Sequence, residues 1–261
     1  MKIVAIGDPH GDLEKVKQIP VKDADLILLT GDLGSVEIAR EHIKNNAERR
    51  KRGLEPLDYG PEKRKEIYYE EYNSTNEILK YLNWFGIPIY TIFGNVELNK
   101  KQVQEVSEYV GEKMPDFYDS MTSFENVRVV WEEVIDFDGL KIGGLNYFDG
   151  TSESTRKDRP KGEGRDGPEE EDRKAKGKVD SFGKVDVLLC HQPPKGYVDT
   201  PKEGLHVGSE VILDYIKKNQ PRYVFCGHIH EGEGHAKIGK SDVYNLGVAG
   251  YKVIDIEPEK G

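Results

Sequence analysis

Five short apolar runs in this chain of 261 residues each end in side chains that can bind a metal ion. The runs span residues 2–6, 25–30, 87–93, 185–190 and 223–226, and most of their residues are valine, isoleucine or leucine. Short runs of this kind, bounded by glycine or polar residues, predict buried β-strands. The polar residues that follow them are Asp8, His10, Asp32, Asn95, Glu97, His191, His228 and His230. We therefore expect a fold in which the ends of several strands carry one polar site.

The order of strands and helices predicts a mixed α/β fold. In the first half the predicted strands alternate with helical segments, which favours parallel pairing, whereas the short strands after residue 235 favour hairpins. This combination fits one mixed sheet, or two packed sheets with helices outside. The loops after the carboxyl ends of parallel strands open on one edge of a sheet. Residues from Asp8 to His230 are therefore expected to meet at that edge.

Two charged segments separate the predicted strands. Residues 35–85 are predicted to form two helices, broken near Gly53 and Pro61. Residues 150–178 consist almost entirely of glycine, proline and charged residues. Because this second segment buries too little apolar surface to offset its ordering entropy, we predict a mobile surface loop within a single domain of residues 1–261. A lid near the site is the alternative.

The residue types at the strand ends suit divalent metal ions. Carboxylate, imidazole and amide groups are ligands for ions such as Mn²⁺, Fe and Zn²⁺, and neither Cys190 nor Cys226 is needed as a ligand. Each piece alone is ordinary, since a Gly-Asp pair after a strand is usually a turn, and a lone histidine there is more often structural. The presence of all five motifs in one order, each at a strand end, favours metal binding.

These motifs resemble the signature of the calcineurin-like metallophosphoesterases, which is Asp-x-His, Gly-Asp, Gly-Asn-x-Glu/Asp, a lone His and Gly-His-x-His. The resemblance covers residues 1 to about 256 and implies a four-layer αββα sandwich of two packed mixed β-sheets flanked by helices. It also implies two divalent metal ions, with Mn²⁺ expected first and Fe, Zn²⁺, Ni²⁺ or Co²⁺ as alternatives. A hydroxide that bridges the two metals would be the nucleophile.

The resemblance also assigns metal ligands residue by residue. One metal would be held by Asp8, His10, Asp32 and His230. The other would be held by Asp32, Asn95, His191 and His228, with Asp32 shared. Asp32, Asn95 and His191 would thus act in catalysis through metal and phosphate binding.

The chain departs from the family pattern at Val96, where many members carry a histidine thought to protonate the leaving alkoxide. General acid catalysis contributes about 10²–10⁴-fold, so we expect slow turnover that favours phosphodiesters or good leaving groups over alkyl monoesters. His206 is a candidate substitute acid or phosphate contact, with an ordinary loop residue as the alternative. Glu97 is predicted to orient Asn95 or a backbone group rather than to bind metal.

Two functions therefore stand open at this level. The first is a metal-dependent phosphoric ester hydrolase that acts on small phosphate esters, more readily on diesters than on monoesters. The second is a catalytically weak or inactive scaffold that keeps the fold. Val96 is the one feature in favour of the scaffold, whereas competent residue types at every ligand position favour the enzyme.

Composition narrows the partners and the location. The formal net charge of −10 disfavours nucleic acid as a partner, because phosphate contacts need clustered lysine and arginine. No apolar stretch approaches the ~20 residues of a membrane span, and two cysteines in a chain of this size fit buried thiols in a reducing compartment. A cytoplasmic protein without a membrane partner is expected. Charged residues make up 33% of the chain, which weakly indicates a thermophilic source.

Overall fold

The strands of this protein form two sheets that pack face to face. The computed structural model describes all residues except 59, 152–166, 203 and 258–261. Five strands form the first sheet, in the order β11 (Tyr251–Asp255), β1 (Lys2–Ile6), β2 (Leu26–Leu29), β3 (Ile89–Thr91) and β4 (Val127–Val129). Six form the second, in the order β5 (Val134–Phe137), β6 (Leu140–Leu145), β7 (Val187–Cys190), β8 (Tyr223–Cys226), β10 (Ser241–Asn245) and β9 (Gly234–Ile238).

Parallel strands make up the middle of both sheets. In the first sheet β1, β2, β3 and β4 are parallel, and β11 joins β1 in antiparallel register with Lys2 opposite Asp255. In the second sheet β6, β7, β8 and β10 are parallel, and β5 and β9 close the two edges in antiparallel register. The carboxyl ends of the parallel strands within each sheet therefore lie at one edge.

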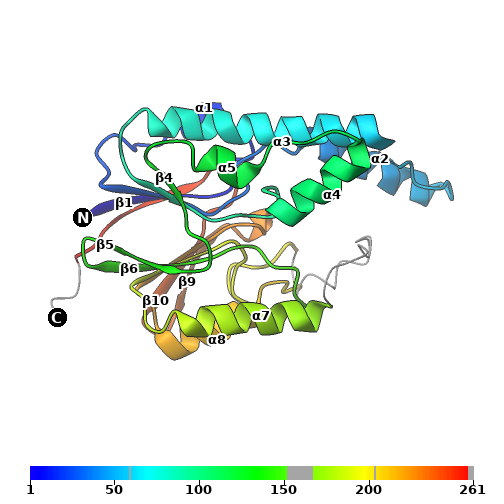
Figure 1. The fold of residues 1–261 in the computed structure, drawn as a ribbon. Coiled ribbons are helices and arrows are strands. Elements are labelled where there is room, and N and C mark those ends of the chain that lie inside the picture. Colours follow the sequence, from blue (N-terminus) through cyan, green and yellow to red (C-terminus); the bar gives the residue numbers. More distant parts are fainter. Residues whose placement is uncertain (59, 152–166, 203, 258–261) are drawn as a thin grey trace.

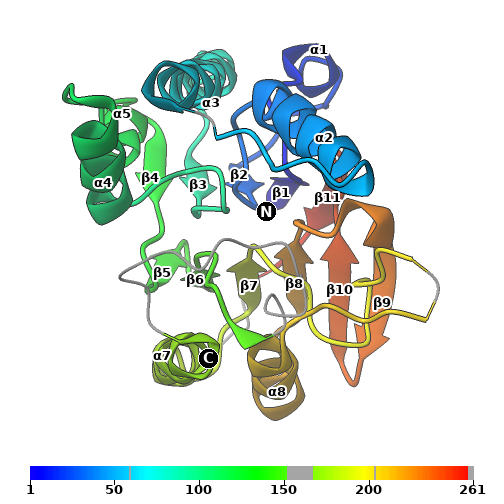
Figure 2. The same cartoon turned by 90° about the vertical axis from the view of Figure 1, so that its right-hand side faces the viewer.

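Helices cover the outer face of each sheet, which gives four layers (Figures 1 and 2). On the side of the first sheet lie α1 (Leu13–Val16), α2 (Glu37–Lys51), α3 (Gly60–Asn83), α4 (Lys100–Val110) and α5 (Phe117–Met121). On the side of the second lie α7 (Pro168–Ser181) and α8 (Glu210–Asn219). A short 3₁₀ turn, η1 (His230–Gly232), follows β8. The αββα sandwich expected from the sequence is confirmed.

Strand β1 shows how the apolar runs divide between two cores. Successive side chains of a strand point to opposite faces, so Ile3 and Ala5 pack between the sheets while Val4 and Ile6 pack under the helices. All four side chains are fully buried. A strand covered on both faces needs an unbroken apolar run, which explains why these runs stand out in the sequence.

The expected loop over residues 150–178 is wrong for its last third, because Pro168–Ser181 forms helix α7. Pro168 occupies the first turn, where a missing N–H has no helical partner to lose. Ala175 and Val179, four residues apart, are buried in the core between the second sheet and its helices. This narrow apolar stripe is enough to hold a helix that is otherwise charged. The mobility and the lid expected for residues 152–166 lie outside the described residues.

Two further sequence features can be placed. Cys190 and Cys226 are free thiols, and both are buried at the ends of β7 and β8. Across the described part of the chain, no helix combines the length and the apolar surface required to cross a membrane.

Candidate metal centre

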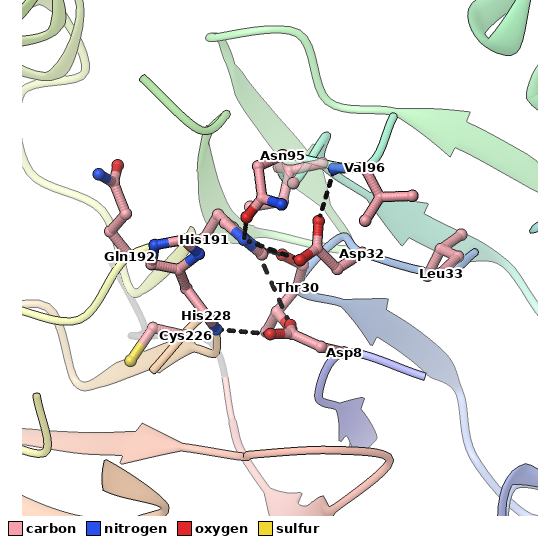
Figure 3. Close-up of polar contacts among 12 residues, drawn as sticks. Asp8, Thr30, Asp32, Leu33, Asn95, Val96, His191, Gln192, Cys226 and His228 are labelled. Atoms are coloured by element: carbon pink, nitrogen blue, oxygen red, sulfur yellow. Dashed lines mark hydrogen bonds and ion pairs between the residues drawn. The ribbon is translucent and has the colours of Figure 1, made fainter. Parts of the chain in front are cut away.

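The ends of the central strands bring the seven predicted metal ligands together. Asp8 follows β1, Asp32 follows β2 and Asn95 follows β3 in the first sheet. From the second sheet, His191 follows β7 and His228 follows β8. Figure 3 shows these five side chains facing one another across the junction of the two sheets. His10 and His230 lie two residues beyond Asp8 and His228, on the same turns.

The first group of donors is Asp8, His10 and His230. One ligand atom from each lies within 4.8 Å of the others. The Nε2 atoms of His10 and His230 are 3.2 Å apart, and His230 Nε2 is 3.4 Å from Asp8 Oδ2. Two imidazole nitrogens and one carboxylate oxygen thus converge on one point.

The second group is Asp32, His191 and His228, whose ligand atoms also lie within 4.8 Å of one another. His191 Nε2 is 3.5 Å from Asp32 Oδ2 and 3.3 Å from the side-chain oxygen of Asn95. The rings of His191 and His228 are 4.9 Å apart between centroids. Asn95 is exposed, so this group opens to solvent on the Asn95 side.

A single oxygen of Asp32 faces both groups. Oδ2 lies 3.7 Å from Nε2 of His10 in the first group and 3.5 Å from Nε2 of His191 in the second. The other oxygen, Oδ1, accepts a hydrogen bond of 2.8 Å from the backbone N–H of Val96. The carboxylate is therefore fixed by one oxygen and offers the other to both donor groups.

Thr30 orients one residue of each group, and sequence reasoning did not single it out. Its hydroxyl donates to Asp8 Oδ1 at 2.7 Å, and its carbonyl oxygen lies 2.8 Å from His191 Nδ1 (Figure 3). Because a carbonyl only accepts, Nδ1 of His191 carries a proton, which leaves Nε2 as the nitrogen that faces a ligand. The available signal was a lone polar residue at the end of an apolar strand.

Glu97 binds backbone N–H groups, including that of Asp32. Its carboxylate accepts hydrogen bonds from the N–H groups of Asp32 (2.9 Å), Leu33 (2.7 Å) and Gly94 (2.8 Å). Of the two sequence alternatives for Glu97, the structure therefore places the carboxylate on backbone groups rather than on Asn95. Burial and the nearby Asp32 raise the pKa of Glu97 to about 7, against the three backbone donors, which lower it.

The charges of the site suit cations. Burial alone would raise the pKa of Asp32, but the imidazole of His191 outweighs it and holds the pKa well below its usual range. Burial also lowers the pKa of His191, yet Asp32 and Asp8 raise it overall. At His10 burial prevails over the same two carboxylates and lowers the pKa. Two fully or nearly fully buried carboxylates, Asp8 and Asp32, thus attract positive charge in a region with little water.

The backbone at the site adopts conformations that non-glycine residues rarely take. His10, Asp32 and His228 have φ values of 44°, 49° and 66°. Residues held in this left-handed region store strain and tend to occur at functional sites. Two glycines allow the close approach of the chain, since a Cβ atom on Gly94 would lie 2.2 Å from Asp32 Oδ1 and one on Gly227 would lie 2.1 Å from Asp8 Oδ1.

The donor set fits two small divalent cations. It consists of carboxylate, imidazole and amide groups, which suit Mn²⁺, Fe, Zn²⁺ and similar ions. The His191 ring is held by a hydrogen bond at its other nitrogen, as histidine ligands usually are. The sulfur atoms of Cys190 and Cys226 instead contact backbone carbonyl oxygens.

Two other side chains belong to the surroundings of the site. The ring of Tyr147, another residue that sequence reasoning missed, packs against His191 and His228 with centroid distances of 5.8 and 5.4 Å. His206 is not among the converging donors. Its ring is half exposed, and its Nδ1 lies 2.7 Å from Asp199 Oδ1.

Comparison with known proteins covers the whole chain. A family model described as metallophosphoesterase, calcineurin superfamily, matches residues 1–260. The human metallophosphoesterase domain-containing protein 1 is 36% identical over 76 residues, which are 28% of this chain and 23% of that protein. The chain therefore matches about a quarter of the length of this relative. A Caenorhabditis elegans UPF0046 protein is 23% identical over 261 residues, which cover 97% of this chain and 77% of that protein.

Solved structures of low sequence identity share the fold. The protein TT1561 of Thermus thermophilus aligns with a TM-score of 0.53 at 18% identity, over 95% of this chain and 90% of that one. A dimetal phosphatase from Danio rerio aligns with a TM-score of 0.51 at 10% identity, over 96% and 88% of the two chains. At these identities the likeness is one of architecture.

Proposed function

Because this chain belongs to the calcineurin superfamily of metallophosphoesterases, we propose that it is a dinuclear metal-dependent hydrolase of small phosphate esters, with a preference for phosphodiesters. The observation that carries the proposal is the position of Asp32 Oδ2 between His10 of one donor group and His191 of the other. A carboxylate oxygen that faces two groups of ligands suits a pair of cations that share it.

The residues present divide between two cations. Asp8, His10, Asp32 and His230 would hold one, and Asp32, Asn95, His191 and His228 the other. Two such ions supply a bound water of lowered pKa and positive charge for the phosphate oxygens. We propose Mn²⁺ as the native ion, with Fe, Zn²⁺, Ni²⁺ and Co²⁺ as alternatives that the same ligands accept.

The chain's own residues position the reacting groups. Thr30 fixes the ring of His191 and one oxygen of Asp8, and Glu97 fixes the turn that carries Asp32. Asn95 is the exposed ligand and therefore lies where a substrate enters. Phosphoryl transfer asks the protein mainly for such positioning and for neutralisation of charge.

Val96 underlies the proposed preference for diesters. Its side chain is 3% exposed and has no proton to donate, so position 96 supplies no general acid. An aryl diester loses a stable aryloxide without protonation, whereas an alkyl monoester loses a strongly basic alkoxide. We therefore propose that alkyl monoesters are the slowest substrates.

The experiment is hydrolysis of bis(p-nitrophenyl) phosphate and of p-nitrophenyl phosphate with added Mn²⁺. Asp32→Asn and His191→Ala should each reduce both rates by more than about 100-fold, because the first removes the negative charge of the shared carboxylate and the second removes an imidazole ligand. His235→Ala is the matched control, since this exposed histidine lies on β9. Activity without metal, or activity retained in both ligand variants, would contradict the proposal.

The scaffold is the second candidate, and the lack of a proton donor at Val96 is the observation in its favour. Metal content separates the two. Purification without chelator should give about two divalent ions per chain for the enzyme and none for the scaffold. Nuclease activity is disfavoured by the net charge of −10. The cytoplasmic location stays a prediction.

A further inference from the structure

The segment between His191 and α8 is tied at its base to the turn that carries His191. Ser209, at the end of the segment, donates its backbone N–H to Pro193 at 2.8 Å and accepts from Lys195 at 3.0 Å. Gly208 packs so closely on this turn that a Cβ atom there would lie 2.7 Å from the carbonyl oxygen of Pro193. Both ends of the segment therefore contact the turn that follows the candidate ligand His191.

The middle of the same segment is tied to the turn that carries His228 and His230. The side-chain amide of Asn245 donates to the carbonyl oxygens of Val198 and Ile229, both at 2.8 Å. Ile229 is the residue between the two histidines. Gly232 packs against the backbone of Asp199, since a Cβ atom on it would lie 3.1 Å from Asp199 N. Asp199 therefore sits between the two histidine turns of the second sheet.

The carboxylate of Asp199 is buried, and its two oxygens bind different partners: one binds backbone N–H groups and the other binds His206. Oδ2 accepts backbone N–H groups from Gly196 (2.9 Å) and Gly208 (2.8 Å). Oδ1 lies 2.7 Å from Nδ1 of His206, and the Asp199 side chain is 0% exposed. Because the carboxylate accepts, Nδ1 of His206 carries the proton in this contact. Nε2 then points away from Asp199, on a ring that is 48% exposed.

This pair differs from an ordinary surface contact. His235 and Asp242 also form a histidine–carboxylate pair, at 2.9 Å, but both side chains are partly exposed, at 46% and 28%. An exposed pair of that kind contributes little to stability. Burial of Asp199 instead carries a desolvation cost that only its hydrogen bonds offset. The segment also holds Val198 at φ 50°, a strained value for a β-branched residue.

We propose that His206, oriented by Asp199, donates the proton to the leaving-group oxygen that Val96 does not supply. This inference rests on the proposed function. In the step, the oxygen of a water molecule bonds to phosphorus, the water releases one proton to solvent, and the bond from phosphorus to the leaving oxygen breaks. That oxygen keeps the electron pair and takes the proton from Nε2 of His206. The imidazole then regains a proton from solvent, so that one ester and one water give a phosphate and an alcohol.

The test is hydrolysis of two diesters with added Mn²⁺. p-Nitrophenyl methyl phosphate has a good leaving group, and phenyl methyl phosphate has a poor one. His206→Ala should reduce hydrolysis of the phenyl ester by about 10²-fold and of the p-nitrophenyl ester by less than about 3-fold, because protonation matters most for the poorer leaving group. Asp199→Asn should show the same pattern with a smaller loss. His235→Ala should leave both rates unchanged.

The outcomes separate the two proposals. An equal loss on both esters, or no loss on either, in His206→Ala overturns proton donation by His206 while the phosphoesterase stands. No hydrolysis of either ester by the wild-type protein overturns the proposed function itself. The hydrolysis rates of Asp199→Asn are compared with those of the wild type once its thermal midpoint shows that the variant is folded.

A second readout does not depend on turnover. Inorganic phosphate added to the Zn²⁺-loaded protein should shift the ¹⁵N resonance of His206 Nε2 and leave that of His235 unchanged. The Nδ1 resonance of His206 should show a bound proton throughout, because Asp199 accepts it. A His206 Nε2 signal that does not respond to phosphate would overturn the inference.

Discussion

The backbone nitrogen of Asp32 lies 2.9 Å from the carboxylate of Glu97, a residue 65 positions later in the sequence. This contact joins the turn after β2 to the turn after β3, and Leu33 and Gly94 donate to the same carboxylate. Glu97 thus fixes the backbone that aims Asp32 at both donor groups. Its role is to hold the candidate ligand Asp32 in place, since its oxygens are occupied by N–H groups.

Glu97→Gln should weaken metal binding by about 10–100-fold, the usual effect of losing a group that orients a ligand. The amide has one accepting oxygen for three backbone donors, and its NH₂ group would face at least one of them. A donor left unsatisfied in this buried place costs about 1–3 kcal/mol. Calorimetric titration with Mn²⁺ and the thermal midpoint measure the two effects. Glu125→Gln, at an exposed position, is the control. Equal metal affinity in both variants would contradict the orienting role of Glu97.

Gly227→Ala should abolish binding at the first donor group. The new Cβ atom would lie 2.1 Å from Asp8 Oδ1, a distance that forces Asp8 or the turn to move. Asp8 cannot move freely, because Thr30 and the backbone N–H of His228 hold its two oxygens. We expect the metal content to fall from about two ions per chain to one or none. Elemental analysis checks this, and full metal content would show that the turn adjusts.

Removal of metal by a chelator should lower the thermal midpoint. Asp8 and Asp32 are at most 2% exposed and would lose the cations that neutralise them. A ligand at 100 times its dissociation constant stabilises by about 2.7 kcal/mol, which corresponds to roughly 5–10 °C for a chain of this size. In Asp32→Asn the difference between loaded and chelated protein should shrink. An identical shift in that variant would place the stabilising ions elsewhere.

The convergence of the candidate metal ligands could be predicted from the sequence because each motif is local and follows a strand. Asp8 and His10 are two residues apart, directly after an apolar run, and so are His228 and His230. The buried strands could be predicted because strands covered on both faces are apolar throughout. The resemblance to the family signature then supplied the four-layer sandwich and the role of each candidate ligand. Composition and periodicity alone do not give either.

The supporting contacts could not be predicted, because they join distant parts of the chain. The carbonyl of Thr30 holds a histidine 161 positions away, and nothing near Thr30 in the sequence indicates this. Asp199 looks like any loop aspartate until the fold buries it between two turns. Helix α7 was missed because a count of apolar residues cannot reveal that Ala175 and Val179 share one face.

Gly177→Ala should stabilise the protein, in contrast to Gly227→Ala. Gly177 lies in the interior of α7 with no neighbouring atom within 4 Å of an added Cβ atom. Glycine inside a helix costs roughly 0.5–1 kcal/mol relative to alanine, so the thermal midpoint should rise by about 1–4 °C. Metal content and activity should not change. A lower midpoint would contradict the continuous helix observed over Pro168–Ser181.

Glu71 should make stability fall as the pH rises. Burial raises the pKa of this carboxyl from 4.5 to about 8, helped by Glu97, Asp32 and Glu70 and opposed by Arg64. Above pH 4.5 the unfolded chain releases this proton while the folded protein keeps it, so the folded state binds more protons until about pH 8. The contribution of Glu71 is therefore most favourable below pH 4.5 and is lost by up to about 1.4 kcal/mol per pH unit on the way to pH 8.

Glu71→Gln removes this titration and keeps a side chain of the same size. The free energy of unfolding, measured with urea at several pH values, should be similar for variant and wild type near pH 5, and the variant should become progressively more stable up to pH 8. Glu97 titrates in both proteins, so the difference between them reports the titration of Glu71 together with its coupling to Glu97. Glu62→Gln, an exposed position on the same helix, should follow the wild-type curve. Parallel curves for Glu71→Gln and wild type would mean that the buried carboxyl is already ionised in the folded protein, because a group with the same charge in both states contributes no slope.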